Sequence, residues 1–223
     1  MIQIPCLDEE STLPATLADL PRQLDGIDRI EILVIDDGSR DRTSEVAREH
    51  GADHVLRFAA NRGLGNAFAA GMDFCLRAGA DIIVNTDGDN QYCGADIAEL
   101  VRPILEGRAE LVIGDRRPGE IEHFSATKKR LQTLGSRTVR RLANLAVPDV
   151  ASGFKAYSRE AASRSNTFAE FDHTVDHVIQ AGRQRIPTLS VPIRTNDQLR
   201  PSRLFSRVGE FISRSLGVMV RVY

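Results

Sequence analysis

Short runs of apolar residues recur along the chain, and between them apolar residues return every three or four positions. The runs are brief and rich in β-branched residues, which favours buried strands. The expected strands are Ile2–Pro5, Glu31–Ile35, His54–Phe58, Asp81–Thr86, Glu110–Gly114, Phe154–Ser158 and Thr188–Ile193.

The stretches between these runs have the period of helices. The expected helices are Thr12–Leu20, Arg42–His50, Gly65–Arg77, Asp96–Leu105, Lys128–Leu145 and Thr174–Ala181. Asp41 precedes the second of them and is its expected N-cap. Strands that alternate with helices predict an α/β fold with a mostly parallel sheet. Because no repeat or low-complexity linker interrupts the 223 residues, one domain is expected.

Composition excludes several classes of protein. The formal net charge of -2 and the absence of Trp argue against nucleic-acid binding. The three cysteines have no CxxC spacing, which fits a reducing compartment and no zinc site. We expect no signal peptide, because Met1 leads directly into "IQIP". No apolar run is long enough to span a bilayer.

Basic residues gather in two stretches with a helical period. Residues 127–146 hold six Lys or Arg and no acid, and residues 200–223 hold five Arg against Glu210. Residues 200–223 are expected to form a basic amphipathic segment that lies on an anionic membrane surface. The alternative is a helix that docks on its own domain with a solvated basic face. The charge pattern alone favours the docked helix; the apolar end of this segment narrows that preference and is what a chain approaching a membrane segment would show.

Acidic clusters follow three of the expected strands. They are "LDEE" after the first strand, "DDGS" after the second and "DGD" after the fourth. In open α/β sheets, ligands bind beyond the carboxyl ends of the strands. Three acidic clusters at one edge of a sheet therefore predict a binding site there.

Asp36 and Asp37 end the second strand and are followed by a Gly-Ser turn. Carboxylates in this place can accept hydrogen bonds from ribose hydroxyls or from a base NH. The simpler alternative is a common Asp-Gly turn with no ligand.

The segment 61–71, "NRGLGNAFAAG", resembles a phosphate-binding loop but lacks the GxGxxG spacing and the Walker lysine. A loop before a close-packed helix start explains this segment equally well.

Asp87 and Asp89 carry the strongest chemical signal, because they flank one glycine at the end of an apolar strand. Two carboxylates in this arrangement can reach one Mg²⁺ or Mn²⁺ ion, whose other ligands are usually water and phosphate oxygens. Gln91 can add a carbonyl oxygen. The alternative is a solvated acidic turn.

His173 and His177 lie four residues apart, as helix-borne metal ligands do. The residues between them do not form the HExxH pattern, so we expect two helix-surface histidines instead. The chain also lacks a GxSxG nucleophile elbow, which argues against acyl transfer.

Taken together, the chain resembles the family 2 glycosyltransferases of GT-A fold. It looks most like their dolichyl-phosphate mannose synthase branch and the bacterial polyprenyl-phosphate glycosyltransferases. The matching segments appear in the family's order and are "IPCLDEE", "VIDDGSRDRT", "NRGLGNAFAAGM", "NTDGDNQY", "SGFKAYSRE" and "VPIRTNDQLRPSRL". The resemblance implies a Rossmann-like, three-layer α/β/α fold, a catalytic domain over residues 1–199 and an inverting reaction.

The resemblance also implies roles for individual residues. The nucleotide sugar, with UDP or GDP, would be bound by Pro5, Leu7, Glu9, Asp36, Asp37, Asp87 and Asp89. The cation would be held by Asp87, Asp89 and Gln91, and the acceptor phosphate by Ser202, Arg203 and Arg130. Asp8 stands where the family usually has Asn, and Arg203 stands where Lys is commoner.

The acceptor decides which catalytic groups are needed. A lipid phosphate is already anionic, so Asp89, through the metal, and Arg203 would suffice. A saccharide hydroxyl needs a carboxylate base, for which Asp176 or Glu170 is the candidate. A nucleotidyltransferase and an inactive nucleotide-binding module are the remaining alternatives. For the lipid acceptor we expect a cytoplasmic protein at the inner face of the cell membrane.

Overall fold

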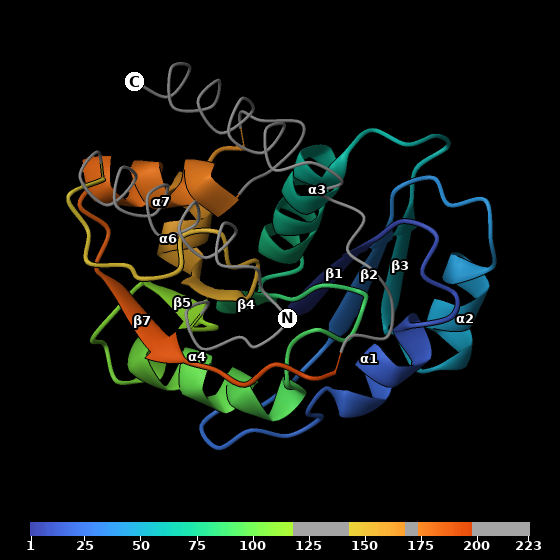
Figure 1. Cartoon of the computed structure of the whole chain (residues 1–223), viewed down its shortest axis with the longest axis horizontal. Coiled ribbons are helices and arrows are strands. Elements are labelled where there is room, and N and C mark those ends of the chain that lie inside the picture. Colours follow the sequence, from blue (N-terminus) through green and yellow to red (C-terminus); the bar gives the residue numbers. More distant parts are fainter. Residues whose placement is uncertain (118–142, 168–173, 198–223) are drawn as a thin grey trace.

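A seven-stranded sheet forms the centre of the protein (Figure 1). The computed structural model describes residues 1–117, 143–167 and 174–197. The strands are β1 (Ile2–Cys6), β2 (Ile32–Asp36), β3 (His54–Arg57), β4 (Ile82–Asn85), β5 (Leu111–Asp115), β6 (Lys155–Ser158) and β7 (Thr188–Pro192). Each strand expected from the sequence is present, and no end differs from the expected one by more than one residue.

Helices connect most of these strands. They are α1 (Leu13–Asp19), α2 (Thr43–Glu49), α3 (Leu64–Arg77), α4 (Ile97–Leu105), α6 (Arg159–Arg164) and α7 (Thr174–Arg183), with a 3₁₀ turn η1 (Gly94–Asp96). The short helix α6 was not predicted; the Ser158 hydroxyl caps it by accepting from the Ala161 NH at 3.0 Å. Most of the expected helix 128–145 lies outside the described residues.

The prediction of Asp41 as N-cap was wrong by one residue. Arg42 holds that position, and helix α2 begins at Thr43. Asp41 still stabilises the start of α2, because its carboxylate accepts hydrogen bonds from the Thr43 NH at 3.0 Å and from the Thr43 hydroxyl at 2.5 Å.

The order of strands is β3-β2-β1-β4-β6-β5-β7. Strand β6 runs antiparallel to both of its neighbours, β4 and β5, and the other pairs are parallel. The carboxyl ends of β1, β2 and β4 are therefore adjacent at one edge of the sheet. The amino end of β6 meets them there.

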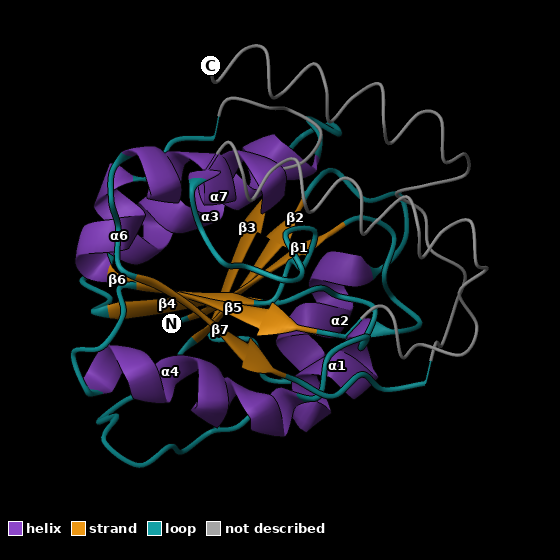
Figure 2. Cartoon of the chain, turned by 60° about the vertical axis from the view of Figure 1, so that its left-hand side comes forward, coloured by secondary structure: helices purple, strands orange, loops and turns teal. Residues whose placement is uncertain are grey.

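Helices cover both faces of the sheet, as Figure 2 shows. Helices α3, α6 and α7 lie on one face, where Phe68, Met72 and Val178 pack with Leu33 and Tyr157 of the strands. Helices α1, α2 and α4 lie on the other face, over a second apolar cluster of the sheet. Strands β1 and β2 are buried along their whole length, which explains their continuous apolar runs. The expected three-layer α/β/α architecture is confirmed.

Candidate active site

The three acidic clusters meet at the carboxyl edge of the sheet, as expected from the sequence. They follow β1, β2 and β4, which are neighbours. The Cys6 thiol lies buried among them. Burial raises the pKa of this thiol well above its usual value, and four carboxylates add to the effect: Glu9, Asp36, Asp87 and Asp89.

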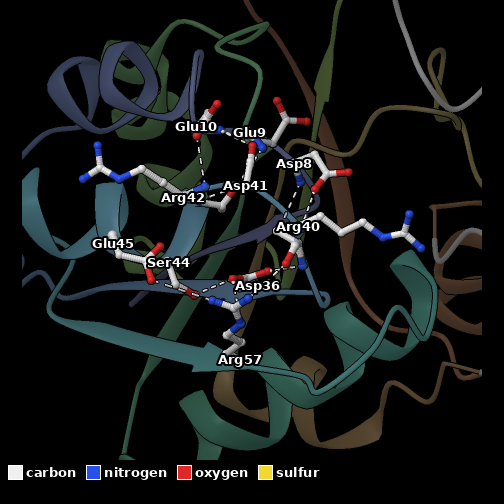
Figure 3. Close-up of polar contacts among 12 residues, drawn as sticks. Asp8, Glu9, Glu10, Asp36, Arg40, Asp41, Arg42, Ser44, Glu45 and Arg57 are labelled. Carbon is white, nitrogen blue, oxygen red and sulfur yellow. Dashed lines mark hydrogen bonds and ion pairs between the residues drawn. The ribbon is translucent and has the colours of Figure 1, made fainter.

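The loops after β1 and β2 are joined by hydrogen bonds (Figure 3). The Asp8 NH donates to the Ser39 hydroxyl at 2.9 Å, and the Asp8 carboxylate accepts from the Arg40 NH at 2.8 Å. Asp8 has a φ of 53°, a left-handed conformation that Asp and Asn adopt more readily than most residues. The residue at the family's Asn position therefore fixes the path of this loop.

Glu9 is buried beside the same loop. Its NH donates to the Thr43 hydroxyl at 2.8 Å, and its carboxylate accepts from the Thr12 hydroxyl at 2.6 Å. Pro5 is buried within β1, and Leu7 is half-buried just beyond its end. All three residues stand at the edge where the resemblance assigns nucleotide binding.

Asp36 is fully buried and bonded to its own turn and to helix α2. Its carboxylate accepts from the Ser39 NH at 2.8 Å and from the Ser44 hydroxyl, and Arg57 lies 3.6 Å from it (Figure 3). These bonds fix the β2 end. Asp36 therefore has a structural role, and its expected role in nucleotide binding stays a prediction.

Asp37 holds the glycine-containing segment 61–63 in place. Its carboxylate accepts from the NH groups of Arg62 at 2.7 Å and Gly63 at 2.9 Å. Burial raises the pKa of Asp37, while these two bonds oppose the rise. Because two amides before α3 donate to Asp37, the segment serves as a close-packed helix start, in agreement with the simpler interpretation of its sequence.

Gly38 permits this close approach. It has a φ of 75°, and a Cβ atom there would lie 2.4 Å from the Ala60 carbonyl carbon. A larger residue would push the segment 60–63 away from Asp37.

Asp87 and Asp89 follow β4 and are both half-buried. The Asp89 carboxylate accepts from the Gln91 NH at 3.2 Å, which places Gln91 beside it. Asn90 has a φ of 57° and forms the corner of this turn. Asn90 had no role in the sequence interpretation; its conformation supplies one, since Asn is enriched at positive φ.

The donor set of this turn fits a divalent cation. Its two carboxylates are oxygen ligands, which Mg²⁺ and Mn²⁺ prefer. Within the described ranges, no three His, Cys, Asp or Glu side chains gather to hold an ion. The turn therefore fits an ion that takes its remaining ligands from phosphate and water, and it does not fit a closed structural site.

Sequence reasoning missed a buried ion pair beside Asp87. The Arg116 guanidinium donates to Asp149 at 2.7 and 2.9 Å, with side chains 9% and 2% exposed. Burial lowers the pKa of Arg116, but Tyr92, Asp149 and Asp87 outweigh burial and raise it. The two partners are 33 residues apart, and no pattern in one sequence indicates such a pairing.

Gly153 and Tyr92 lie close to Asp87 and contact each other. A Cβ atom on Gly153 would lie 3.1 Å from an Asp87 oxygen, so the carboxylate lies close to the Gly153 backbone. The Gly153 NH donates to the Tyr92 hydroxyl at 3.1 Å, and the Tyr92 ring stacks on Phe154 at 4.9 Å between centroids. The backbone just before β6 therefore lies against the Asp87 carboxylate.

The segment after β7 runs antiparallel to the end of the same turn. The Asn196 NH donates to the Gln91 carbonyl at 2.9 Å, and Thr195 forms a bridge with Tyr92. The Asn196 amide also donates to the Tyr92 carbonyl at 3.2 Å. Ser202 and Arg203, which follow this segment in the sequence, lie outside the described residues, and so does Arg130.

Asp176 and His177 do not lie with the acidic clusters. Both are buried in α7, and the Asp176 carboxylate accepts from the Gln180 amide at 2.6 Å. The expectation of a helix-surface histidine is wrong for His177, because it packs edge-on against Phe68 with 5.0 Å between ring centroids. His173 and Glu170 lie outside the described part of the chain.

A cavity of about 360 Å³ lies at the opposite edge of the sheet. It is lined by residues at the starts of β1 and β4, such as Met1 and Ile82, and by Ile27, Ile30 and Leu105. The lining also includes the charged residues Asp28, Arg29, Glu31 and Asp81, and it is remote from the acidic clusters. The chemistry of the residues therefore places the candidate site at the carboxyl edge.

In the part of the chain that the structure describes, we find no helix long and apolar enough to cross a bilayer.

Known proteins resemble this chain over most of its length. An undecaprenyl-phosphate mannosyltransferase from Micrococcus luteus is 29% identical over 96% of this chain and 84% of its own. A UDP-N-acetylglucosamine–dolichyl-phosphate N-acetylglucosaminyltransferase from Methanococcus voltae is 28% identical over 86% of this chain and 83% of its own.

A solved structure shares the fold. Glucosyl-3-phosphoglycerate synthase from Mycobacterium tuberculosis, in complex with Mn²⁺, UDP and phosphoglyceric acid, matches with a TM-score of 0.72. The match covers 99% of this chain and 77% of that chain at 21% identity. The family model described as glycosyl transferase family 2 matches residues 1–165. The chain therefore belongs to glycosyl transferase family 2 and is a glycosyltransferase.

Proposed function

We propose that this enzyme transfers a sugar from a nucleotide diphosphate to a polyprenyl or dolichyl phosphate, with inversion at the anomeric carbon. The observation that carries the proposal is the half-buried pair Asp87 and Asp89 at the edge where the ends of β1, β2 and β4 meet. Two carboxylates that supply oxygen ligands fit a cation that is shared with a diphosphate. Family membership supports the sugar chemistry.

On the donor side, Pro5, Leu7, Glu9, Asp36 and Asp37 would line the nucleotide pocket. The bonds of Asp36 and Asp37 to the Ser39, Arg62 and Gly63 amides support this assignment indirectly, because they make the rim of the pocket rigid. Mg²⁺ or Mn²⁺ held by Asp87, Asp89 and Gln91 would neutralise the charge that develops on the departing diphosphate. The Mn²⁺ and UDP in the synthase of similar fold are consistent with this donor chemistry.

On the acceptor side, two relatives are named for undecaprenyl phosphate and dolichyl phosphate. A phosphate oxygen is ionised at neutral pH and needs no base, so basic residues can bind and orient it. We assign this role to Arg130, Ser202 and Arg203.

The proposal extends to the location of the enzyme. We infer that residues 1–199 form the catalytic domain and that the basic segment 200–223 contacts the membrane that carries the lipid acceptor. The positive charge of both basic stretches supports contact with the anionic inner face of the cell membrane.

A turnover assay tests the proposed function. The enzyme is incubated with radiolabelled UDP- and GDP-sugars, MnCl₂ or MgCl₂, and either undecaprenyl phosphate or free oligosaccharides. We expect label in the lipid fraction and its loss with EDTA. Label in the oligosaccharide fraction alone would replace the proposal with the saccharide acceptor, and turnover unaffected by EDTA would remove the metal from it.

A further inference from the structure

We infer that one face of helix α1, formed by Thr12, Thr16 and Asp19, positions the loop that carries Asp87 and Asp89. Residues four and three positions apart share one face of a helix. The sequence "TLPATLAD" therefore places these three polar side chains together. The inference rests on the proposed function, because it concerns how the cation-binding loop is held.

The Gly88 carbonyl is the first point of contact. The hydroxyls of Thr12 and Thr16 each lie 3.0 Å from the Gly88 oxygen, and both threonines are buried, with 2% and 3% exposure. A buried carbonyl requires a hydrogen-bond donor, and helix α1 supplies it across more than 70 residues of sequence.

The two hydroxyls are not equivalent, because each carries one proton. The Thr12 hydroxyl also lies 2.6 Å from the Glu9 carboxylate, which competes for its proton as a charged acceptor. The Thr16 hydroxyl has only the Thr12 carbonyl, at 3.4 Å, as an alternative. Thr16 is therefore the principal donor to Gly88, and Thr12 connects Gly88 to Glu9.

Gly88 is also pressed against strand β1. A Cβ atom on Gly88 would lie 2.8 Å from the Cys6 sulfur and 3.4 Å from the Glu9 Cγ. The peptide between Asp87 and Asp89 is thus fixed by packing as well as by the hydroxyls. Since both aspartates adjoin this glycine, the orientation of its peptide fixes the backbone positions from which the two side chains extend.

Asp19 holds the other end of the same loop. Its carboxylate accepts from the Gly94 NH at 2.6 Å, and a Cβ atom on Gly94 would lie 2.2 Å from the Asp19 carbonyl oxygen. Helix α1 therefore holds the loop from Gly88 to Gly94 at both ends. Loss of supporting residues around a metal site typically costs about 10–100-fold in metal affinity or activity.

The test measures how much Mn²⁺ improves nucleotide binding. Calorimetry gives the dissociation constants of UDP and GDP with MnCl₂ and with EDTA, and their ratio is the gain from the metal. For Thr16→Val we expect this gain to fall on the order of tenfold, while affinity in EDTA changes less than about twofold. Thr16→Ser keeps the hydroxyl and should restore the gain.

Thr188→Val is the matched control. The Thr188 hydroxyl also donates to a backbone carbonyl, that of Ile186 at 2.8 Å, but at the opposite edge of the sheet. This variant should keep the wild-type gain. A structural defect without a positioning role would lower affinity with and without metal alike, so the ratio separates the two roles.

Each outcome decides between the proposals. If wild-type protein shows no gain from Mn²⁺, the proposed metal-dependent function fails before the variants are compared. If wild type shows the gain and Thr16→Val keeps it, the role of helix α1 is overturned. If Thr16→Val does not fold, Asp19→Ala, at an exposed position, replaces it and should lose several-fold of the gain; an unchanged gain would overturn the inference.

Discussion

Two segments of this chain carry polar residues at spacings typical of ligands, and the structure places them in opposite surroundings. The segment "DGDNQY" turns at the carboxyl edge of the sheet, with Asp87 and Asp89 half-buried. The segment "HTVDH" continues into α7, where Asp176 and His177 are 0% and 1% exposed. The comparison teaches that spacing alone does not identify a binding site. A ligand also needs access, which the half-buried Asp87 and Asp89 allow and the inner face of α7 does not.

Among the variants that test this comparison, the largest effect is expected from substitution of Asp89. We predict that Asp89→Ala lowers the gain in UDP or GDP affinity from Mn²⁺ by about 100-fold or more, because loss of a supporting residue alone typically costs about 10–100-fold. Calorimetry with MnCl₂ and with EDTA measures it. Asp81→Ala, an exposed aspartate at the other end of the same strand, should behave as wild type. Equal gains in both variants would remove Asp89 from the metal site.

His177 should affect stability and not binding. Its ring nitrogens lie 3.1 Å from the Tyr157 hydroxyl and 3.2 Å from the Thr167 hydroxyl. His177→Ala leaves a cavity and an unpaired buried hydroxyl, so we expect the free energy of unfolding to fall by about 2–5 kcal/mol. Urea denaturation measures it, with the exposed His50→Ala as control. A loss of nucleotide affinity at unchanged stability would mean that His177 contributes to binding, as Asp87 and Asp89 are expected to do.

A smaller effect is expected at Asn196, which joins the segment after β7 to the turn. Asn196→Ala removes the amide that donates to the Tyr92 carbonyl at 3.2 Å, to the Asp19 carboxylate at 3.3 Å and to Asn90 at 3.4 Å. We expect roughly a threefold loss of the gain from Mn²⁺, the scale of one ordinary hydrogen bond. Asn166→Ala, between α6 and α7, serves as the control in the same calorimetry. If both variants matched wild type, the turn would not depend on this segment.

The smallest expected effect is on the pH dependence of stability. Burial, reinforced by the charge of Lys155, lowers the pKa of His177 to about 3. Between that value and the unfolded pKa of about 6.5, only the unfolded state binds the proton, so the stabilising contribution is complete above pH 6.5 and is lost as the pH falls toward 3.

Comparison with a variant isolates this contribution from the carboxylates that titrate in the same range. The free energy of unfolding of His177→Phe should fall less steeply with acid than that of wild type, by up to about 1.4 kcal/mol per pH unit. Parallel curves for the two proteins would mean that His177 is accessible to protons in the folded state.

Much of the fold could be predicted because the signals are local. Strands β1 and β2 are buried on both faces and therefore read as unbroken apolar runs. Helix α6 escaped prediction because its six residues are too few to show a helical period. The antiparallel direction of β6 also escaped prediction, since an apolar run has the same appearance in either direction.

The candidate site likewise contains residues that the sequence indicates and residues that it does not. Asp36, Asp37, Asp87 and Asp89 stand out in the sequence because each lies within two residues of a glycine at the end of an apolar run. Thr16, Asn196 and the Arg116–Asp149 pair do not, because their partners lie 72, 104 and 33 residues away. Contacts over such separations depend on the order of strands in the sheet.

By itself, the sequence determined the alternation of strands and helices, the acidic strand ends and the resemblance to family 2 glycosyltransferases. Tertiary structure alone decided that "DGD" lies at an accessible edge while "VDH" lies in the core, and that a threonine of α1 bonds the glycine between the two aspartates. The physical reason is that residue type and local period fix which elements form, whereas burial and hydrogen-bond partners are fixed only when those elements pack together.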